Sequence, residues 1–320
     1  MATKNQPISV QLSRNSLESE HIVDVCISDQ TAVFEAFGDV ERSVIPRSAI
    51  KPIQVLPLLR SGAADAFSVT DVEVALGAAS HSGEAEHVEA VDSWLGRIGL
   101  DRSALECGID RPISVAEGDR LLRAGETFEA IHNCCSGKHT GFLTTAIHLG
   151  VDPAGYIHRD HPVQELVTDA IAEFTGVDVH AETSGADGCG IPTFAIPLDA
   201  LARSMARLVT SEDEAAQRVT TALSNNPFWI SGTDRCEVNV VGAATEPLVM
   251  KQGAEGVYMA ALPERGLGIA LKARDGAVRA GNAAIAGVLG YLGVVSESLG
   301  VSNIANKAGT VVGAMEVRLP

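Results

Sequence analysis

The chain has 320 residues, of which 24 are basic and 41 acidic, giving a formal net charge of −17. A chain of this length can bury a substantial core, as one large domain or as two closely packed ones. The acidic balance repels phosphate backbones and so disfavours nucleic-acid binding. No stretch is long and apolar enough to span a membrane, and residues 1–7 lack the apolar segment of a secretory signal, so we expect a cytoplasmic protein.

The N-terminal part of the chain has the alternating pattern of β-strands. Polar and apolar residues alternate over 8–12, 21–28 and 31–37, with polar breaks between these segments. From about residue 47 the pattern becomes helical, and the strands are therefore expected to end before that point.

Two helices are expected in the next part of the chain. Thr70 and Glu73 have the spacing of a capping box ahead of an alanine-rich helix that ends near Ser80. A second helix is expected over 84–98.

Helical periodicity is clearest after Asp160. A helix is expected to begin near Pro162, with apolar residues at helical spacing as far as Phe174, and Gly176 is expected to close it. Residues 211–214 open a further capped helix.

The C-terminal third returns to strands. Residues 256–262 and 267–273 are predicted to form a hairpin, and a Gly/Ala-rich helix is expected over 279–294. A last strand is expected over 309–319.

Strands at both chain ends and helices between them predict an α+β fold rather than a doubly wound one. We expect an antiparallel sheet built from about 8–38 and 247–320, with a helical middle region of about 47–245 packed against it. The whole chain, 1–320, is expected to form a single domain.

Lysine is rare in this chain, and its positions are therefore informative. Six of the 24 basic residues are lysines: Lys4, Lys51, Lys138, Lys251, Lys272 and Lys307. A surface that uses arginine and acidic residues for solubility has little general need of lysine. Arginine stays protonated, whereas a desolvated lysine can lose its proton and act as a base. The lysines that lie in polar motifs are candidates for chemistry.

Ser48 and Lys51 form a first candidate pair. If residues 48–59 are helical, positions i and i+3 share a face, and Lys51 can activate the Ser48 hydroxyl as a nucleophile. Pro52 and Pro57 predict a short or kinked helix, with Ser48 near its start, where free N–H groups can stabilise an oxyanion. The alternative is an ordinary solvated helix start.

Two later elements strengthen this hypothesis. Residues 80–82 (SHS) follow the S-x-x-K motif, and Lys251 opens a K-x-G element before a predicted strand. This is the order found in penicillin-binding proteins and class A β-lactamases, although His81 and Ser82 replace the Asp and Asn of their middle element. The alternatives are a helix-terminal serine and a solvated charge at a strand start. The three elements together predict an acyl-transfer site.

The cysteines are candidates for a second site, one that binds a metal ion. Most of the six are expected to be core thiols, but Cys134 and Cys135 lie in the polar run 132–139 (HNCCSGKH). Cys189 lies between glycines in 187–190 (DGCG), where a tight turn can expose backbone to a ligand. Together with His139, these thiols offer enough donors for zinc, although no C-x-x-C pair is present.

These runs resemble the class 3, rhizobial-type L-asparaginases. The resemblance runs from about residue 8 to the C-terminus and follows the motif order of that family throughout. It is carried by the following segments: 47–52 (RSAIKP), 80–84 (SHSGE), 132–139, 161–164 (HPVQ) and 187–190.

The resemblance implies an L-asparagine amidohydrolase with a fold similar to that of serine β-lactamases. That family uses two serine–lysine tandems. Ser48 and Lys51 match the first, and Ser80 matches the serine of the second. Lys251 is expected to be its lysine because it heads the K-x-G strand, with Lys272 as a weaker rival.

The resemblance also implies one zinc ion and a homodimer. The zinc ligands of the family match Cys135, Lys138 and Cys189, and a ligating lysine must be neutral. The implied substrate-binding residues are Arg47, His139, Asp187 and Gly188. Asp187 is expected to pair with the α-ammonium group of asparagine, and zinc is expected to orient the substrate rather than to generate hydroxide.

Three other functions remain open at this point. One is a related serine amidase acting on glutamine, a dipeptide or a β-lactam. A second is hydrolysis by zinc hydroxide, with Ser48 only binding the substrate. The third is a non-catalytic protein that binds zinc or an amino acid. Residues 231–236 are polar and loop-like, and they carry no assigned role.

Overall fold

The computed structural model describes residues 6–181 and 185–320 of the chain. These residues divide into two compact units. One comprises residues 6–49, 195–210 and 239–320 and is called the sheet unit below. The other comprises residues 50–181, 185–194 and 211–238 and is called the helical unit. The prediction that the whole chain is a single domain stays a prediction.

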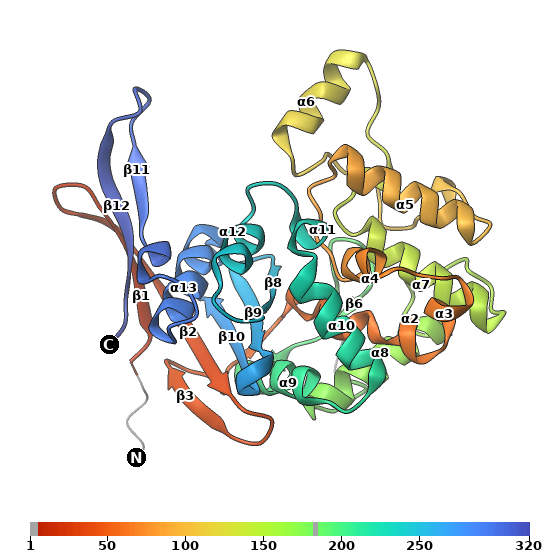
Figure 1. The fold of residues 1–320 in the computed structure, drawn as a ribbon, viewed down its shortest axis with the longest axis horizontal. Helices are drawn as coiled ribbons and strands as arrows, with labels where there is room; N and C mark the ends of the chain where they lie inside the picture. The colour runs from red at the N-terminus through yellow and green to blue at the C-terminus, as the bar shows by residue number, and fades with distance from the viewer. Residues whose placement is uncertain (1–5, 182–184) are drawn as a thin grey trace. The chain divides into compact units, whose positions relative to one another are not determined.

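The sheet unit is built on one antiparallel sheet of eight strands in the order β11-β12-β1-β2-β10-β9-β8, with β3 also paired to β2 (Figure 1). Its strands are β1 (Ile8–Ser13), β2 (Leu17–Ser28), β3 (Val33–Phe37), β8 (Val249–Gly253), β9 (Val257–Leu262), β10 (Leu267–Ala273), β11 (Ser302–Ala305) and β12 (Val311–Arg318). Both chain ends contribute to this sheet, as the sequence predicts. The mixed helix and antiparallel-sheet fold class is confirmed.

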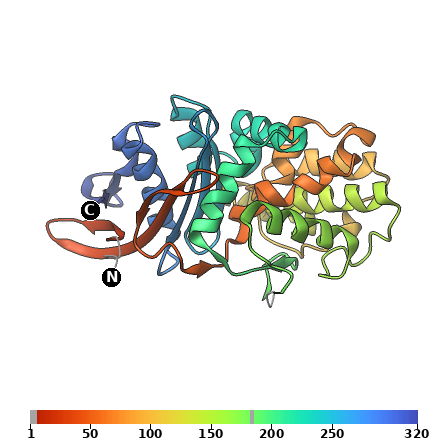
Figure 2. The same cartoon turned by 90° about the horizontal axis from the view of Figure 1, so that it is seen from below.

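Two helices cover the sheet. Figure 2 shows α9 (Leu198–Thr210) and α13 (Val278–Tyr291) on opposite faces, and both pack against β2, β9 and β10. Small buried residues such as Gly281 and Ala284 let α13 approach the strands closely. The helix predicted over 279–294 is confirmed. Helix α9 was not predicted separately, and it belongs to the sheet unit although it lies within the predicted helical middle region.

The helical unit contains most of the helices of the chain. These are α1 (Lys51–Gln54), α2 (Leu56–Arg60), α3 (Ala63–Ala66), α4 (Asp71–Gly77), α5 (Ala85–Arg97), α6 (Val115–Ala124), α7 (Ser136–Leu149), α8 (Pro162–Thr175), α10 (Glu214–Asn225) and α11 (Pro227–Ser231). A further helix, α12 (Cys236–Ala243), crosses the boundary between the two units. Two short strand pairs complete the chain: β4 (Ser43–Val44) with β7 (Ile196–Pro197), and β5 (Gly185–Ala186) with β6 (Pro192–Thr193). None of the described helices is long and apolar enough to cross a membrane.

Several helix boundaries follow from local chemistry. The capping box is present before α4: the Thr70 hydroxyl accepts from the backbone N–H of Glu73, whose carboxylate accepts from the backbone N–H of Thr70. Pro162 begins α8, and Gly176 ends it in the left-handed conformation, as predicted. Pro52 and Pro57 each lie in the first turn of a short helix, so the segment after Ser48 is broken into pieces.

Helix α7 is the central helix of the helical unit. It packs against α2, α3, α4, α5 and α8, and every residue from Ser136 to Ala146 is buried. A helix that is buried on all sides shows no polar face in its sequence. This is why periodicity gave no prediction for α7.

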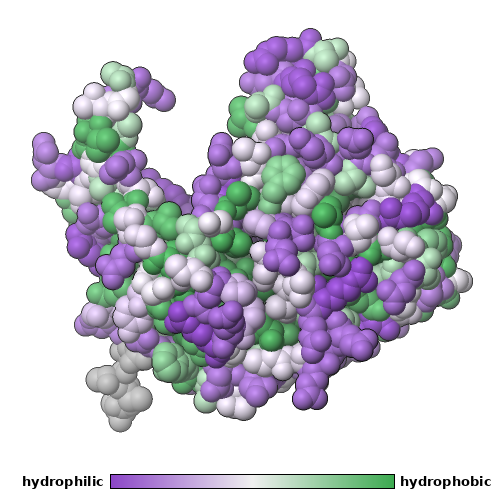
Figure 3. Space-filling model, viewed as in Figure 1, coloured by the Kyte–Doolittle hydropathy of each residue, from purple (hydrophilic) through white to green (hydrophobic). Residues whose placement is uncertain are grey.

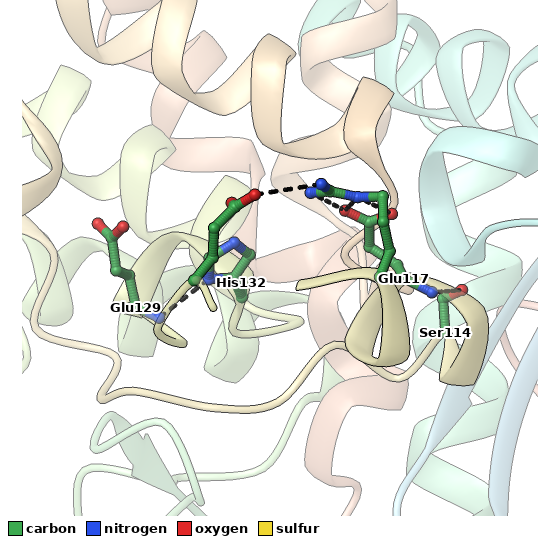
Figure 4. Close-up of polar contacts among 6 residues, drawn as sticks. Ser114, Glu117, Glu129 and His132 are labelled. Atoms are coloured by element: carbon green, nitrogen blue, oxygen red, sulfur yellow. Dashed lines mark hydrogen bonds and ion pairs between the residues drawn. The ribbon is translucent and has the colours of Figure 1, made fainter. Parts of the chain in front are cut away.

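Helix α6 has a hydrophilic outer surface (Figure 3). The Ser114 hydroxyl caps its start by accepting from the backbone N–H of Glu117, whose carboxylate pairs with Arg120. In the segment that leads towards α7, the backbone N–H of Glu129 donates to His132 Nδ1 at 2.9 Å (Figure 4). These contacts hold surface elements of the helical unit in place.

Gly253, at the end of β8, is expected to tolerate no larger residue. A Cβ there would lie 2.6 Å from the carbonyl oxygen of Pro46 and 3.1 Å from the backbone nitrogen of Ala49. Neither backbone atom can rotate away, so Gly253→Ala should lower the free energy of unfolding by about 1–3 kcal/mol. Urea unfolding followed by circular dichroism measures this change.

Gly242→Ala is the matched control. Gly242 lies in α12, and no atom lies within 4 Å of a Cβ added there. Alanine favours a helix over glycine by about 0.5–1 kcal/mol, so this variant should be as stable as the parent or slightly more stable. Equal stabilities for the two variants would contradict the close packing of β8 on residues 46–49.

Candidate active site

Three of the five lysines within residues 6–181 and 185–320 are almost completely buried. Lys51, Lys138 and Lys251 are at most 1 % exposed and rank among the largest fully buried side chains of the protein. Lysine is almost never fully buried unless its amine is paired. Lys272 is partly exposed and donates to the backbone carbonyl of Glu255 at 2.6 Å. The rare lysines singled out from the sequence are therefore mostly interior residues of the fold.

The amine of Lys51 joins three groups of the helical unit. Its Nζ donates to the carbonyl oxygen of Ala79, to Ser80 Oγ at 3.0 Å and to Cys135 Sγ at 3.1 Å. An ammonium group has three N–H donors and can donate to all three partners. A neutral amine has two N–H donors and one lone pair, so it could donate to two partners and accept from the Ser80 hydroxyl. The structure thus brings Lys51 to Ser80. The pairings of Ser48 with Lys51 and of Ser80 with Lys251 stay predictions.

Ser80 lies in a well-held turn that follows α4. Its backbone N–H donates to the carbonyl of Ile230 at 2.9 Å, and the N–H of His81 donates to the carbonyl of Cys134 at 3.1 Å. The Ser82 hydroxyl donates to the carbonyl of Ser231 at 2.7 Å. The loop around residue 231, which carries no role in the sequence analysis, therefore fixes the position of the Ser80 turn.

His81 supports the same turn from inside the core. Its Nδ1 accepts from the N–H of Gly83 at 3.1 Å, and its Nε2 lies 2.8 Å from the Ser136 hydroxyl at the start of α7. Burial is the main cause that lowers the pKa of His81 well below its usual value, with a further contribution from His87. A neutral imidazole therefore connects the Ser80 turn to α7.

Cys135, Lys138 and Cys189 come together in the helical unit. Lys138 Nζ lies 3.1 Å from Cys189 Sγ, and Cys189 sits in the turn that joins β5 to β6. In that turn the backbone N–H of Asp187 donates to the carbonyl of Ile191 at 2.8 Å. We call these three residues the thiol–lysine cluster.

The thiol–lysine cluster has strongly altered proton affinities. Hydrogen bonds with Cys134 and then with Cys189 hold the pKa of Cys135 well below its usual value, with the charges of Lys51 and Lys138 adding to the effect. The hydrogen bond with Cys135 is the main cause that raises the pKa of Cys189, followed by burial. The pKa values of these two neighbouring thiols are therefore shifted in opposite directions.

Burial acts to lower the pKa of Lys138, but the nearby thiols of Cys189 and Cys135 outweigh it and raise that pKa above its usual value. The charge of Asp187 acts in the same direction. The surroundings of Lys138 therefore favour the charged form of its amine.

The donor set of this cluster fits a zinc ion. Two thiolate sulfurs and a neutral amine are acceptable ligands once the protons on Cys189 and Lys138 have left, and metal binding releases such protons. In the described part of the chain, no group of three or more His, Cys, Asp and Glu side chains could hold a metal ion. The cluster contains only two residues of those types, because its third donor is a lysine.

His139 follows Lys138 in α7 and is completely buried. Its Nδ1 lies 2.7 Å from the hydroxyl of Tyr156. Burial is the main cause that lowers the pKa of His139 well below its usual value, and the charge of Lys138 adds to it. Tyr156 has no part in the sequence analysis. A lone tyrosine after a polar loop shows no local pattern that could have identified it.

The sheet unit positions Ser48 and Lys251. Ser48 lies in the 3₁₀ helix Arg47–Ile50, beside the end of β8, as the close approach of Gly253 to Pro46 and Ala49 shows. Lys251 is fully buried in β8 and donates to the carbonyl of Gln252 at 2.7 Å. The sheet unit therefore contains both Ser48, the serine of the S-x-x-K motif, and β8, the strand that carries the K-x-G motif.

Arg47 has an unusual backbone conformation. Its φ of +50° lies in the left-handed region, which costs a non-glycine residue about 1–3 kcal/mol and is frequent at functional sites. Asp187 is half-buried and lies close enough to raise the pKa of Lys138, while Gly188 is exposed and donates its N–H to Asp187 Oδ1 at 2.7 Å. The roles of Arg47, His139, Asp187 and Gly188 in substrate binding stay predictions.

A serine hydroxyl in contact with a buried lysine amine is typical of serine hydrolases that form acyl-enzymes. The comparison with protein families is more specific, because the model described as L-asparaginase II matches residues 10–317. The chain belongs to the L-asparaginase II family, and the resemblance found in the sequence is confirmed. Membership of this family supports an amidohydrolase that acts on a small-molecule amide. No match was found among curated proteins.

Solved structures with a similar fold include a β-lactamase from Mycobacterium bovis, at 14 % identity and a TM-score of 0.44, covering 85 % of this chain and 95 % of that one. A second, titled as the native form of Mglu, has 15 % identity and a TM-score of 0.47 and covers 84 % of this chain and 64 % of that one. A third, titled as a putative β-lactamase from Bacteroides dorei, has 11 % identity and a TM-score of 0.42 and covers 78 % and 84 %.

Proposed function

We propose that this protein is an L-asparagine amidohydrolase that releases L-aspartate and ammonia through a serine acyl-enzyme assisted by lysine. The observation that carries the proposal is the buried amine of Lys51, which lies 3.0 Å from Ser80 Oγ in a member of the L-asparaginase II family. A serine needs a base to become a nucleophile, and a buried lysine can serve when it is neutral.

In the proposed mechanism Lys51 takes the proton of Ser48, and Ser48 attacks the side-chain amide carbon of asparagine. Backbone N–H groups near the start of the helical segment hold the oxyanion. Ser80 and Lys251 pass a proton to the departing ammonia and then help to activate the water that hydrolyses the acyl-enzyme. The contact between Lys51 and Ser80 supports this scheme, because the amine of the first proposed tandem lies at the serine of the second.

We also propose that Cys135, Lys138 and Cys189 hold one zinc ion. When bound, the ion would supply a positive charge that orients the substrate. Arg47, His139, Asp187 and Gly188 would bind the substrate, and Asp187 would pair with its α-ammonium group. The homodimeric state and the cytoplasmic location implied by the resemblance and the sequence belong to the same proposal.

Ammonia release from L-asparagine tests the reaction. Ser48→Ala should lower kcat/KM by at least about 10³-fold, because removing a nucleophile leaves only the binding and oxyanion contributions. Ser80→Ala should lower it by about 10²- to 10⁴-fold, the range for a proton-transfer group. L-Glutamine, dipeptides and β-lactams form the competing substrate panel.

Ser16→Ala, at an exposed position outside the site, is the control and should keep the parent rate. Full activity in Ser48→Ala that is lost on chelation would favour attack by zinc hydroxide instead. Tight binding of asparagine without ammonia release would favour a non-catalytic binding protein. Hydrolysis of another member of the panel, but not of asparagine, would favour a related serine amidase.

Zinc content tests the metal site. Cys135→Ala and Cys189→Ala should each reduce bound zinc from about one ion per chain to a small fraction of that, because each removes a thiolate ligand. Atomic absorption on the purified variants measures the content, and isothermal titration with L-aspartate measures the expected loss of affinity. Cys236→Ala, outside the thiol–lysine cluster, should keep its zinc. A Cys135→Ala enzyme with full affinity and turnover would contradict the orienting role.

A further inference from the structure

His139 has one buried ring nitrogen whose role the fold does not explain. Its Nδ1 lies 2.7 Å from the hydroxyl of Tyr156. Its Nε2 is also buried, and throughout residues 6–181 and 185–320 it has no hydrogen-bond partner. Leaving such a group unpaired is costly, so we expect that a bound ligand supplies its hydrogen-bond partner.

Tyr156 determines which nitrogen of His139 carries the proton. The backbone N–H of Glu106 donates to the Tyr156 oxygen at 2.8 Å. Burial is the main cause that raises the pKa of Tyr156, so the phenol keeps its single proton. That proton has Nδ1 of His139 as its acceptor, and Nδ1 must therefore be unprotonated.

A neutral imidazole carries one N–H. Because Nδ1 accepts from Tyr156 and so carries no proton, the N–H of His139 is at Nε2. The unpartnered atom is therefore a hydrogen-bond donor. His139 directly follows Lys138 in the first turn of α7, which places it beside the thiol–lysine cluster.

Tyr156 is held firmly in this position. Gln164 Nε2 donates to its backbone carbonyl at 2.9 Å, and its ring meets the His139 ring edge-on with centroids 5.3 Å apart. Its side chain is completely buried. The hydroxyl therefore cannot turn away to another partner.

We propose that Tyr156 is a positioning residue that fixes His139 in its Nε2–H tautomer, and that this N–H donates to a carboxylate or carbonyl oxygen of the bound amino acid. The identity of the ligand rests on the proposed function. The tautomer rests only on the contacts among Glu106, Tyr156 and His139.

Nuclear magnetic resonance of protein labelled with ¹⁵N in the imidazole rings tests the tautomer without any ligand. The signals of His139, one of nine histidines, are assigned by their loss in His139→Gln. We expect a one-bond N–H coupling at Nε2 and none at Nδ1. In Tyr156→Phe the coupling should divide between the two nitrogens. A proton on Nδ1 in the parent protein, or an unchanged pattern in Tyr156→Phe, would overturn the proposal.

Titration with L-aspartate, the proposed product, tests the donor. Binding should shift the Nε2–H proton of His139 downfield. If calorimetry shows that L-aspartate binds while this proton does not move, the donor role is overturned. If L-aspartate does not bind, the proposed function fails, and the coupling pattern still decides the role of Tyr156.

Kinetics separate positioning from a structural role. Tyr156→Phe should raise KM for L-asparagine about twofold, because about half of the molecules then carry the proton on the wrong nitrogen. His139→Leu, which has no donor, should raise KM about 10- to 100-fold. In His139→Gln, the glutamine amide can place an N–H near the position of Nε2 and has no tautomers. Tyr156 then has no tautomer to determine, so Tyr156→Phe should leave KM unchanged in this background.

Tyr258→Phe is the matched control, because Tyr258 is also buried and its hydroxyl donates to Asn282 Oδ1 at 2.7 Å in the sheet unit. It should leave KM unchanged. An equal effect of Tyr156→Phe in the parent and His139→Gln backgrounds would mean that Tyr156 acts only on the fold, and would overturn the proposal.

Discussion

The helical unit depends on one buried amine, that of Lys51. An amine inside a protein must be hydrogen-bonded, because its desolvation is otherwise too costly. Three groups from two segments distant in sequence meet this need: Ala79 and Ser80, which follow α4, and Cys135, which precedes α7. The requirement therefore fixes the position of the Ser80 hydroxyl relative to a base and to the thiol–lysine cluster.

Cys135 links the Lys51–Ser80 pair to the other two residues of the thiol–lysine cluster. On one side its sulfur accepts from Lys51, which contacts Ser80, and on the other it is hydrogen-bonded to Cys189, which contacts Lys138. A change in the charge of the cluster therefore acts on the serine site through a single sulfur atom. Helix α7 is the element that makes this possible, because its buried first turn carries Lys138 and His139 on a rigid support.

Much of the fold could be predicted from the sequence where a pattern is local. Alternation predicted β1 and β3, and helical periodicity with its capping residues predicted α4 and α8. Neither α7, buried on all sides, nor β11, a short strand with exposed residues, has such a pattern. The rarity of lysine made Lys51, Lys138 and Lys251 candidates for chemistry, and all three are buried. It could not show that Lys51 contacts Ser80, because a contact across 29 residues depends on how the helices pack. Tyr156 was missed for the same reason.

The activity of Lys51→Met tests the central claim most directly. Methionine keeps the length of the side chain without its amine, and its flexible thioether adapts to irregular space in a core. We predict that kcat/KM for ammonia release from L-asparagine falls by about 10²- to 10⁴-fold, with a circular dichroism spectrum like that of the parent. Lys307→Met, at an exposed position, should keep full activity. A folded Lys51→Met enzyme with activity within a few-fold of the parent would contradict the account.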